Sequence, residues 1–120
     1  RQRQMCIRDR DMPMLFKRSR ASQALSPTEA HTRTDVQVVD VRSGQEWHTG
    51  HVPRAQHIPL DELPSRLGEL NRAQPVAFIC QSGARSRMAT KIATQAGLEA
   101  ININGGMTAW QRAGLPTITR

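Results

Sequence analysis

The stretch Val76-Ala-Phe-Ile-Cys80, followed by Gln81-Ser-Gly-Ala-Arg-Ser86, decides the fold class of this 120-residue chain. Its first five residues form an almost unbroken apolar run, which is typical of a strand buried on both faces of a parallel sheet. After the polar loop, apolar residues recur at helical spacing up to Gly97: Met88, Ala89, Ile92, Ala93 and Ala96. A strand, a loop and a helix in this order predict one unit of an α/β fold.

The segments before this stretch continue the alternation of short helices and short strands. Two capping boxes, Ser26 with Glu29 and Ser43 with Glu46, predict the first turns of two short helices. Between them, the β-branched run Val36–Asp40 is typical of a strand. A helix, a strand and a second helix are therefore expected in the first half of the domain.

The remaining elements complete the predicted domain. His57-Ile58-Pro59 is a brief extended piece, and Asp61 is predicted to cap a helix with one apolar face: Leu63, Leu67 and Leu70. Ala100–Ile103 is typical of another strand, and Gly105-Gly106 is expected to turn into a last helix around Trp110. This order predicts a small α/β domain with a central, mostly parallel sheet flanked by helices.

The formal net charge of +7 is concentrated in the first twenty residues. Residues 1–20 contain seven Arg or Lys against two Asp, whereas residues 21–120 contain ten basic and eight acidic side chains. Segment 1–20 has no clear helical or alternating apolar period, and its run Met5-Cys-Ile-Arg-Asp-Arg10 resembles a translated sequencing adaptor. We expect residues 1–20 to be a disordered or non-native basic tail and residues 21–120 to be the folded domain.

The composition disfavours several classes of function. A nearly balanced charge over residues 21–120, with two Phe, two Trp and no Tyr in the chain, argues against a nucleic-acid-binding face. No apolar run approaches the roughly 18 residues that a membrane span needs, so no membrane partner is expected. Two cysteines make neither a disulfide framework nor a CxxC-type zinc site, and we expect no metal and no cofactor. The lack of a secretory signal and of a disulfide pattern favours the cytoplasm.

Cys80 is the candidate catalytic residue because it lies between a buried strand and a helix. Ligands of open parallel sheets bind beyond the carboxyl ends of the strands. Loop N–H groups and the helix dipole at that place stabilise a thiolate and lower its pKa. Gly83 lets the backbone approach an anion closely, and Arg85 adds a planar cation suited to an oxyanion. A lone cysteine at a strand end is usually a small buried apolar residue, but this loop favours the functional interpretation.

The spacing between Cys80 and Arg85 distinguishes two kinds of cysteine chemistry. Cysteine-dependent phosphatases have five residues between the cysteine and the arginine, whereas four residues separate Cys80 from Arg85. The shorter loop makes a smaller cradle, which matches a persulfide or its sulfur donor better than a tetrahedral phosphate. The candidate bases His48, His51 and His57 are expected in surface or capping positions, so no base is assigned.

Four sequence elements, the last of them in two parts, together resemble the single-domain rhodanese family, which is thiosulfate sulfurtransferase-like. They match, in chain order, the end of its first strand, its E-[FW]-x-x-G-H-I-P signature, its C-x-x-G-x-R-S active loop and its closing G-G-x-x-x-W and A-G-L-P elements: Val39–Arg42, Glu46–Pro53, Cys80–Ser86, Gly105–Trp110 and Ala113–Pro116. The resemblance covers residues 25–119. One departure is Arg54, where the family commonly has glycine; it adds a charge and leaves the active loop untouched.

The resemblance implies a sulfurtransferase that works in two steps. Cys80 would attack the outer sulfur of a small sulfur-containing anion such as thiosulfate, and the persulfide would pass its sulfur to cyanide, a thiol or a sulfur-acceptor protein. The donor would be bound by the loop residues Gln81, Ser82, Gly83, Ala84, Arg85 and Ser86. Asp40 and Arg42 would support the site through an ion pair, with Glu46 as a further partner.

Two other functions are compatible with these residues. One is a non-catalytic rhodanese-like binding or regulatory module, and the other is a cysteine-dependent phosphatase or arsenate-reductase-like enzyme, which the short loop disfavours. The oligomeric state is not specified by the sequence, and a monomer or weak dimer is expected.

Overall fold

The computed structural model of the protein describes residues 24–119, so the predicted basic tail, residues 1–20, lies outside the described residues. Five strands form one sheet in the order β1-β5-β4-β2-β3. They are β1 (Ala24–Leu25), β2 (Gln37–Asp40), β3 (Gln56–His57), β4 (Val76–Ile79) and β5 (Ala100–Ile103). Every pairing in this sheet is parallel, which confirms the predicted fold class.

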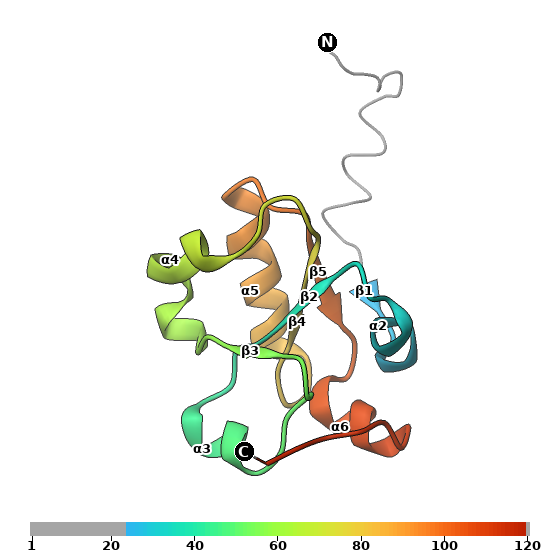
Figure 1. The fold of residues 1–120 in the computed structure, drawn as a ribbon. Helices are drawn as coiled ribbons and strands as arrows, with labels where there is room; N and C mark the ends of the chain where they lie inside the picture. Colours follow the sequence, from blue (N-terminus) through green and yellow to red (C-terminus); the bar gives the residue numbers. More distant parts are fainter. Residues whose placement is uncertain (1–23, 120) are drawn as a thin grey trace.

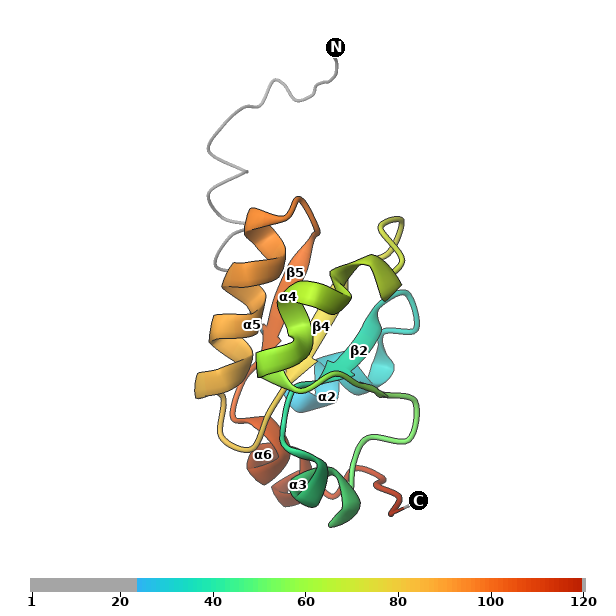
Figure 2. The same cartoon turned by 90° about the vertical axis from the view of Figure 1, so that its left-hand side faces the viewer.

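Helices cover both faces of the sheet (Figures 1 and 2). On one face lie α2 (Pro27–Thr32) and α6 (Gly106–Arg112), and on the other lie α4 (Leu63–Arg66) and α5 (Ala84–Gln95). The short helix α3 (Gly44–His48) follows β2 and lies, with α6, at the edge where the strands end. No helix within residues 24–119 combines the length and the apolar character that crossing a membrane requires.

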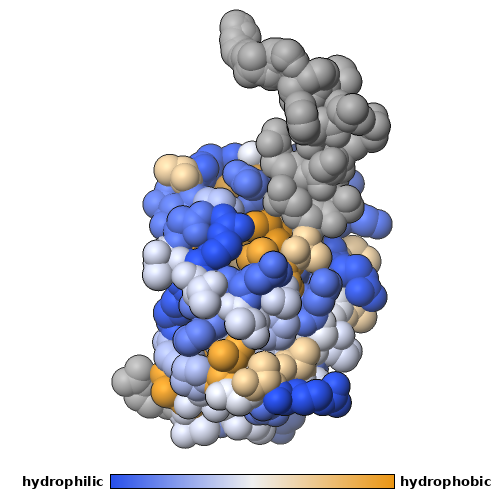
Figure 3. All heavy atoms as spheres, turned by 90° about the vertical axis from the view of Figure 1, so that its right-hand side faces the viewer, coloured by the Kyte–Doolittle hydropathy of each residue, from blue (hydrophilic) through white to orange (hydrophobic). Residues whose placement is uncertain are grey.

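The central strand β4 is buried on both faces, as its apolar run predicts. Val76 and Phe78 pack into the core under α4 and α5, whereas Ala77 and Ile79 pack into the core under α2 and α6, where Trp110 is fully buried. Seen from the side of α2 and α6, hydrophilic residues dominate the described surface, and hydrophobic ones form small separate areas (Figure 3).

The register of the sheet brings the ends of three strands together. Asp40 of β2 is paired with Ile79 of β4, and Phe78 of β4 is paired with Asn102 of β5. Because the strands are parallel, the residues that follow them meet at one edge of the sheet. Cys80, which follows β4 directly, lies in the middle of this edge.

Both predicted capping boxes are present. The hydroxyl oxygen of Ser26 accepts from the N–H of Glu29, whose carboxylate accepts from the N–H of Ser26 at the start of α2. Ser43 and Glu46 make the same reciprocal contacts at the start of α3. These local signals are reliable because both partners lie within one turn of the chain.

The predicted cap at Asp61 is wrong. Asp61 is exposed within a 3₁₀ turn, Leu60–Glu62, and α4 begins at Leu63 without a side-chain cap. Pro64 lies in the first turn of α4 and has no N–H, so one of the groups that a cap would satisfy is missing. The predicted apolar face is nevertheless present, since Leu63 and Leu70 are buried and Leu67 packs against the same core.

Met88 is the other residue whose position differs from the prediction. It points outward from α5, and half of its surface is exposed. The buried stripe of this helix consists of small residues: Ser86, Ala89, Thr90 and Ala93. Their size allows α5 to lie close to β4 and β5. The helix was therefore correctly predicted, but its buried face contains two polar residues in place of Met88.

Candidate active site

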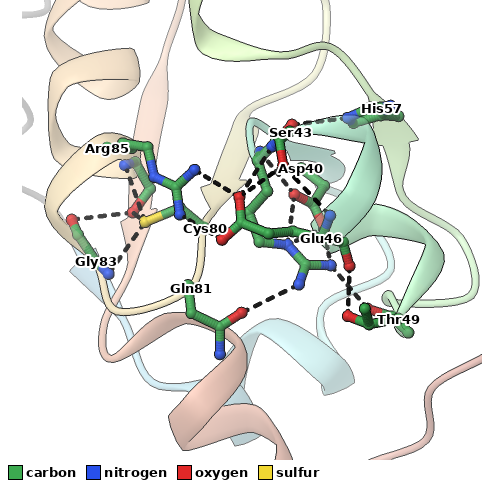
Figure 4. A network of polar contacts seen from close by, with 12 residues as sticks. Asp40, Ser43, Glu46, Thr49, His57, Cys80, Gln81, Gly83 and Arg85 are labelled. Carbon is green, nitrogen blue, oxygen red and sulfur yellow. Dashed lines mark hydrogen bonds and ion pairs between the residues drawn. The ribbon is translucent and has the colours of Figure 1, made fainter.

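Cys80 lies directly after β4, and its thiol is buried (Figure 4). The backbone N–H groups of Gly83 and Ser86 point at the sulfur, with N···Sγ distances of 3.1 and 3.3 Å. The sulfur also lies 3.4 Å from the hydroxyl oxygen of Ser86. The loop thus surrounds the sulfur with hydrogen-bond donors, which favour a negative charge there.

Helix α6 determines which way the peptide groups of the loop face. The N–H of Met107 donates to the carbonyl of Cys80 at 2.8 Å, and the N–H of Thr108 donates to the carbonyl of Gln81 at 3.1 Å. Gly106 permits this approach, because a Cβ at this position would overlap the Cys80 carbonyl oxygen and its φ is +57°. The carbonyls at the start of the loop are therefore bound by α6, away from the sulfur.

Two opposing effects act on the pKa of Cys80. Burial of the thiol raises the pKa, whereas hydrogen bonds from the Ser86 hydroxyl and from the N–H groups of Ser86, Gly83 and Ser82 lower it. The hydrogen bonds together outweigh burial, so the pKa of Cys80 lies below the ordinary value for cysteine. The nucleophilic thiolate is therefore more abundant at neutral pH than it is for a free cysteine.

The hydroxyl of Ser86 is shared among three neighbours. Besides the sulfur of Cys80, it lies 2.5 Å from Oδ1 of Asn102 and 3.1 Å from the carbonyl oxygen of Gly83. A hydroxyl carries one proton and donates it to one strong acceptor at a time. The orientation of the Ser86 hydroxyl is therefore coupled to the charge of Cys80.

Asn102 is a site residue that the sequence-based prediction missed. It is buried in β5, where it accepts from the Ser86 hydroxyl and donates to the side chain of Asn104. The available signal was an asparagine inside the otherwise apolar run Ala100–Ile103, because a buried amide needs hydrogen-bond partners. Identifying its partner required the register of β5 beside β4.

Arg85 forms a bidentate ion pair with Glu46 of α3. The distances are 2.7 Å from Nη1 to Oε1 and 2.8 Å from Nη2 to Oε2, and both side chains are half-buried. The hydrogen bonds from Arg85 outweigh burial and, together with those from Ser43, hold the pKa of Glu46 at about 2. Glu46 was expected beside Arg42, but both of its carboxylate oxygens are occupied by Arg85 and the cap of α3.

Asp40 and Arg42 form a fully buried ion pair, with 2.8 Å between Oδ2 and Nη2. The same guanidinium donates to the carbonyl of Gly50 at 2.7 Å and to Oε1 of Gln81 at 3.2 Å. Gln81 continues the chain of contacts to the hydroxyl of Thr108 at 3.1 Å. Arg42 therefore connects β2, the segment after α3 and Gln81 of the active loop.

The loop residues differ in exposure. Gly83 and Ser86 are buried, Gln81 and Arg85 are half-buried, and Ser82 and Ala84 are exposed. Of the six predicted donor-binding residues, Gly83 and Ser86 direct their N–H groups to the sulfur, whereas the guanidinium of Arg85 is bound to Glu46. In residues 24–119, no group of three or more His, Cys, Asp or Glu side chains could hold a metal ion.

The three histidines considered as candidate bases take different positions. His48 is exposed, as expected, but His51 is buried, and its ring stacks on Trp47 at 3.4 Å between ring centroids. His57 is half-buried and stacks on the same indole at 4.7 Å. His51 is not at the surface, but it has the expected capping role, because its ring bonds the carbonyl of Trp47 in the last turn of α3 and stacks on the indole of the same residue. Within the described residues, none of the hydrogen bonds of Cys80 involves a histidine.

Two similar proteins are named as sulfurtransferases. A protein named sulfurtransferase from Allochromatium vinosum is 38% identical over 98 residues, which are 81% of this chain and 91% of that protein. The thiosulfate sulfurtransferase GlpE of Shewanella oneidensis is 28% identical over 99 residues, covering 82% of this chain and 95% of that protein.

A solved structure and a family model indicate the same family. The crystal structure of a rhodanese-related protein from Thermoplasma volcanium is similar with a TM-score of 0.79 and 27% identity, over 82% of this chain and 99% of that one. The profile described as the rhodanese-like domain matches residues 26–113, which include the whole active loop. The chain therefore belongs to the rhodanese-like domain family.

Proposed function

We propose that the protein is a sulfurtransferase that carries sulfane sulfur, as a persulfide on Cys80, from a donor such as thiosulfate to a thiophilic acceptor. The observation that carries the proposal is the setting of Cys80. Its thiol has a lowered pKa and faces the N–H groups of Gly83 and Ser86. The names of the two sulfurtransferase relatives support the same activity.

In the first step, the Cys80 thiolate attacks the outer sulfur of the donor. With thiosulfate, a bond forms between the two sulfur atoms, the bond from the outer sulfur to the sulfonate sulfur breaks, and its electron pair leaves with sulfite. The negative charge then resides on the terminal sulfur of the persulfide. The N–H groups of Gly83 and Ser86 stabilise the attacking Cys80 thiolate.

In the second step, an acceptor attacks the terminal sulfur of the persulfide. Cyanide, a small thiol or a thiol of a sulfur-acceptor protein can form the new bond to this sulfur, and the electron pair of the broken bond returns to Cys80 as thiolate. The lowered pKa of Cys80 makes it a better leaving group in this step than an ordinary cysteine. One residue thus serves as nucleophile first and as leaving group second.

A specific observation favours a second candidate, a non-catalytic binding module. The guanidinium of Arg85 is bound to Glu46 by two hydrogen bonds. An anionic donor would have to compete for it. The phosphatase alternative has no such support, because the loop between Cys80 and Arg85 is one residue shorter than in that class.

The deciding experiment is the intact mass of the protein after treatment with thiosulfate. The proposal predicts a gain of about one sulfur atom on Cys80, which dithiothreitol removes. Cys80→Ser should abolish the gain and the formation of thiocyanate from thiosulfate and cyanide. Cys6→Ser is the matched control, since it removes the other cysteine of the chain and should leave both signals intact.

A non-catalytic module would give a different result. If the wild-type protein and Cys6→Ser gain no sulfur from thiosulfate or from an organic thiosulfonate, the sulfurtransferase proposal fails. Turnover that persists in Cys80→Ser would equally contradict the assigned role of Cys80.

A further inference from the structure

Arg85, the cation of the active loop, already has an anionic partner. Glu46 accepts two parallel hydrogen bonds from its guanidinium, at 2.7 and 2.8 Å, in the fork geometry that arginine makes with planar oxyanions. A donor with a sulfonate-type group would need the same N–H groups. Glu46 and the donor therefore compete for one guanidinium.

The capping box of α3 fixes the carboxylate of Glu46. Its Oε1 accepts from the backbone N–H and from the hydroxyl of Ser43, both at 3.1 Å, as well as from Arg85. Movement of Glu46 would leave the N–H of Ser43 without its partner in the capping box. A donor therefore has to draw Arg85 away from a carboxylate that stays in place.

The charges around Cys80 cancel in pairs. Arg85 is paired with Glu46 (Figure 4), and the buried guanidinium of Arg42 is paired with Asp40. Once Cys80 is ionised, these five groups together carry one negative charge. A donor with two negative charges is repelled by this arrangement more strongly than a donor with one.

From this arrangement we infer that Glu46 sets the charge selectivity of the donor site by competing for Arg85, so that the protein favours monoanionic sulfane-sulfur donors over dianionic ones. The inference rests on the proposed sulfurtransferase function and narrows its donor class. Glu46 acts through Arg85 and is therefore a positioning residue. Thiosulfate, a dianion, should then transfer its sulfur to the wild-type chain more slowly than a monoanionic donor of the same shape does.

Two donors of matched shape isolate the effect of charge. Thiosulfate has three oxygens on its inner sulfur, and methanethiosulfonate has a methyl group in place of one of them and carries a single negative charge. Each is attacked by the Cys80 thiolate at its outer sulfur. The bond between the two donor sulfurs breaks, and its electron pair leaves with sulfite or with methanesulfinate. Cyanide serves as the common acceptor, so thiocyanate is measured in both cases.

The test variant is Glu46→Gln, whose amide oxygen still accepts from the N–H of Ser43 while its charge is gone. We expect kcat/KM for thiosulfate to rise about tenfold through a lower KM, the size of one charge-assisted contact. For methanethiosulfonate the change should stay below about threefold. High salt should reduce the gain for thiosulfate, because it screens the freed charge of Arg85.

Three controls separate this effect from damage to the fold. Glu29→Gln removes the equivalent carboxylate from the capping box of α2 and should leave both donors unchanged. The double variant Glu46→Gln/Arg85→Gln should lose the gain. Arg87→Gln, which removes an exposed cation whose guanidinium lies near Gly83, should not abolish the gain of Glu46→Gln when the two are combined.

The rate at which Cys80 is alkylated is an independent measurement, because it needs no sulfurtransferase activity. Iodoacetate and iodoacetamide react with the same thiolate and differ by one negative charge. In Glu46→Gln, the ratio of the iodoacetate rate to the iodoacetamide rate should rise several-fold over wild type. This ratio still tests the inference if neither donor gives turnover and the proposed function fails.

The inference is overturned if Glu46→Gln changes both donors equally or lowers the thiosulfate rate while the alkylation ratio stays constant. That result would mean that Glu46 only holds the loop in shape. If Glu46→Gln does not fold, Glu46→Asp replaces it, since the shorter carboxylate keeps its charge but reaches Arg85 less well. The selectivity should then shift in the same direction by a smaller factor, and no shift contradicts the inference.

Discussion

At the scale of single residues, the Ser86 hydroxyl is the most consequential group beside Cys80. It contributes the largest of the hydrogen-bond effects that lower the pKa of the thiol, ahead of the backbone N–H groups. The hydroxyl can donate its single proton to the sulfur or to Oδ1 of Asn102. The amide oxygen lies closer to the hydroxyl oxygen than the sulfur does. The strength of the nucleophile thus depends on a residue of the neighbouring strand as well as on the loop.

We predict that Ser86→Ala raises the pKa of Cys80, because the thiolate loses a hydrogen bond that the thiol does not need. The alkylation rate with iodoacetamide at pH 7 should fall about tenfold, and its pH profile should move to higher pH. Ser65→Ala is the matched control, since that exposed hydroxyl bonds only within α4 and its preceding turn. A pH profile of Ser86→Ala that coincides with wild type would refute the role given to this hydroxyl.

At the scale of elements, the active loop is built by two helices that follow different strands. Helix α5 supplies the N–H of Ser86, and α6 binds the carbonyls of Cys80 and Gln81. Gly106 is the contact point between α6 and the loop, because no side chain fits between its Cα and the Cys80 carbonyl. The orientation of the loop therefore depends on how α6 docks.

Gly106→Ala should destabilise the protein by about 3 kcal/mol, since it combines a positive φ with overlap against backbone atoms that cannot rotate away. Urea denaturation measures this loss, and the sulfur uptake of Cys80 should fall even where the protein is folded. Gly44→Ala is the control: a Cβ at this first position of α3 meets no atom within 4 Å, and its stability should be unchanged or slightly higher. Equal stabilities of the two variants would contradict the steric argument.

The elements also show what can be predicted from sequence and why. Capping boxes such as Ser43 with Glu46 are local, so both partners are visible within one turn. The choice of Arg85 over Arg42 as the partner of Glu46 is not local, because it depends on where α3 lies relative to α5. The burial of His51 likewise depends on a stacking partner that only the folded segment provides.

The same distinction holds for the active site. The motif from Cys80 to Ser86 is contiguous, so its residues could be named from the sequence, together with the strand and the helix that flank it. Asn102 could not be named, since its role arises from the parallel register that sets β5 beside β4. The polar contacts that cross between strands are therefore the part of the site that sequence patterns leave open.

At the scale of the whole molecule, the guanidinium that pairs with Asp40, that of Arg42, also contacts segments that are far apart in the chain. Both side chains are fully buried, and Arg42 also binds the carbonyl of Gly50 and the side chain of Gln81. A charge left without its partner in such a place is costly. The pair therefore holds β2, the segment after α3 and the active loop in place relative to one another.

Asp40→Asn should lower the free energy of unfolding by about 3 kcal/mol, because it leaves the buried guanidinium of Arg42 without a counter-charge. The matched control is Asp35→Asn, which removes a carboxylate that is paired with Arg33 at the same sequence spacing but on the surface. Its urea midpoint should remain close to wild type, because solvent screens exposed pairs. Similar midpoints for both variants would show that burial of the Asp40 pair does not matter.

The contacts of α6 have a consequence for the newly synthesised chain. Cys80 leaves the ribosome well before Gly106, Met107 and Thr108, whose backbone positions orient the loop around it. Until α6 has been made and has docked, the contacts that orient the peptide groups of Cys80 and Gln81 are missing. The full arrangement around Cys80 therefore requires α6, a helix that is translated after the loop it orients.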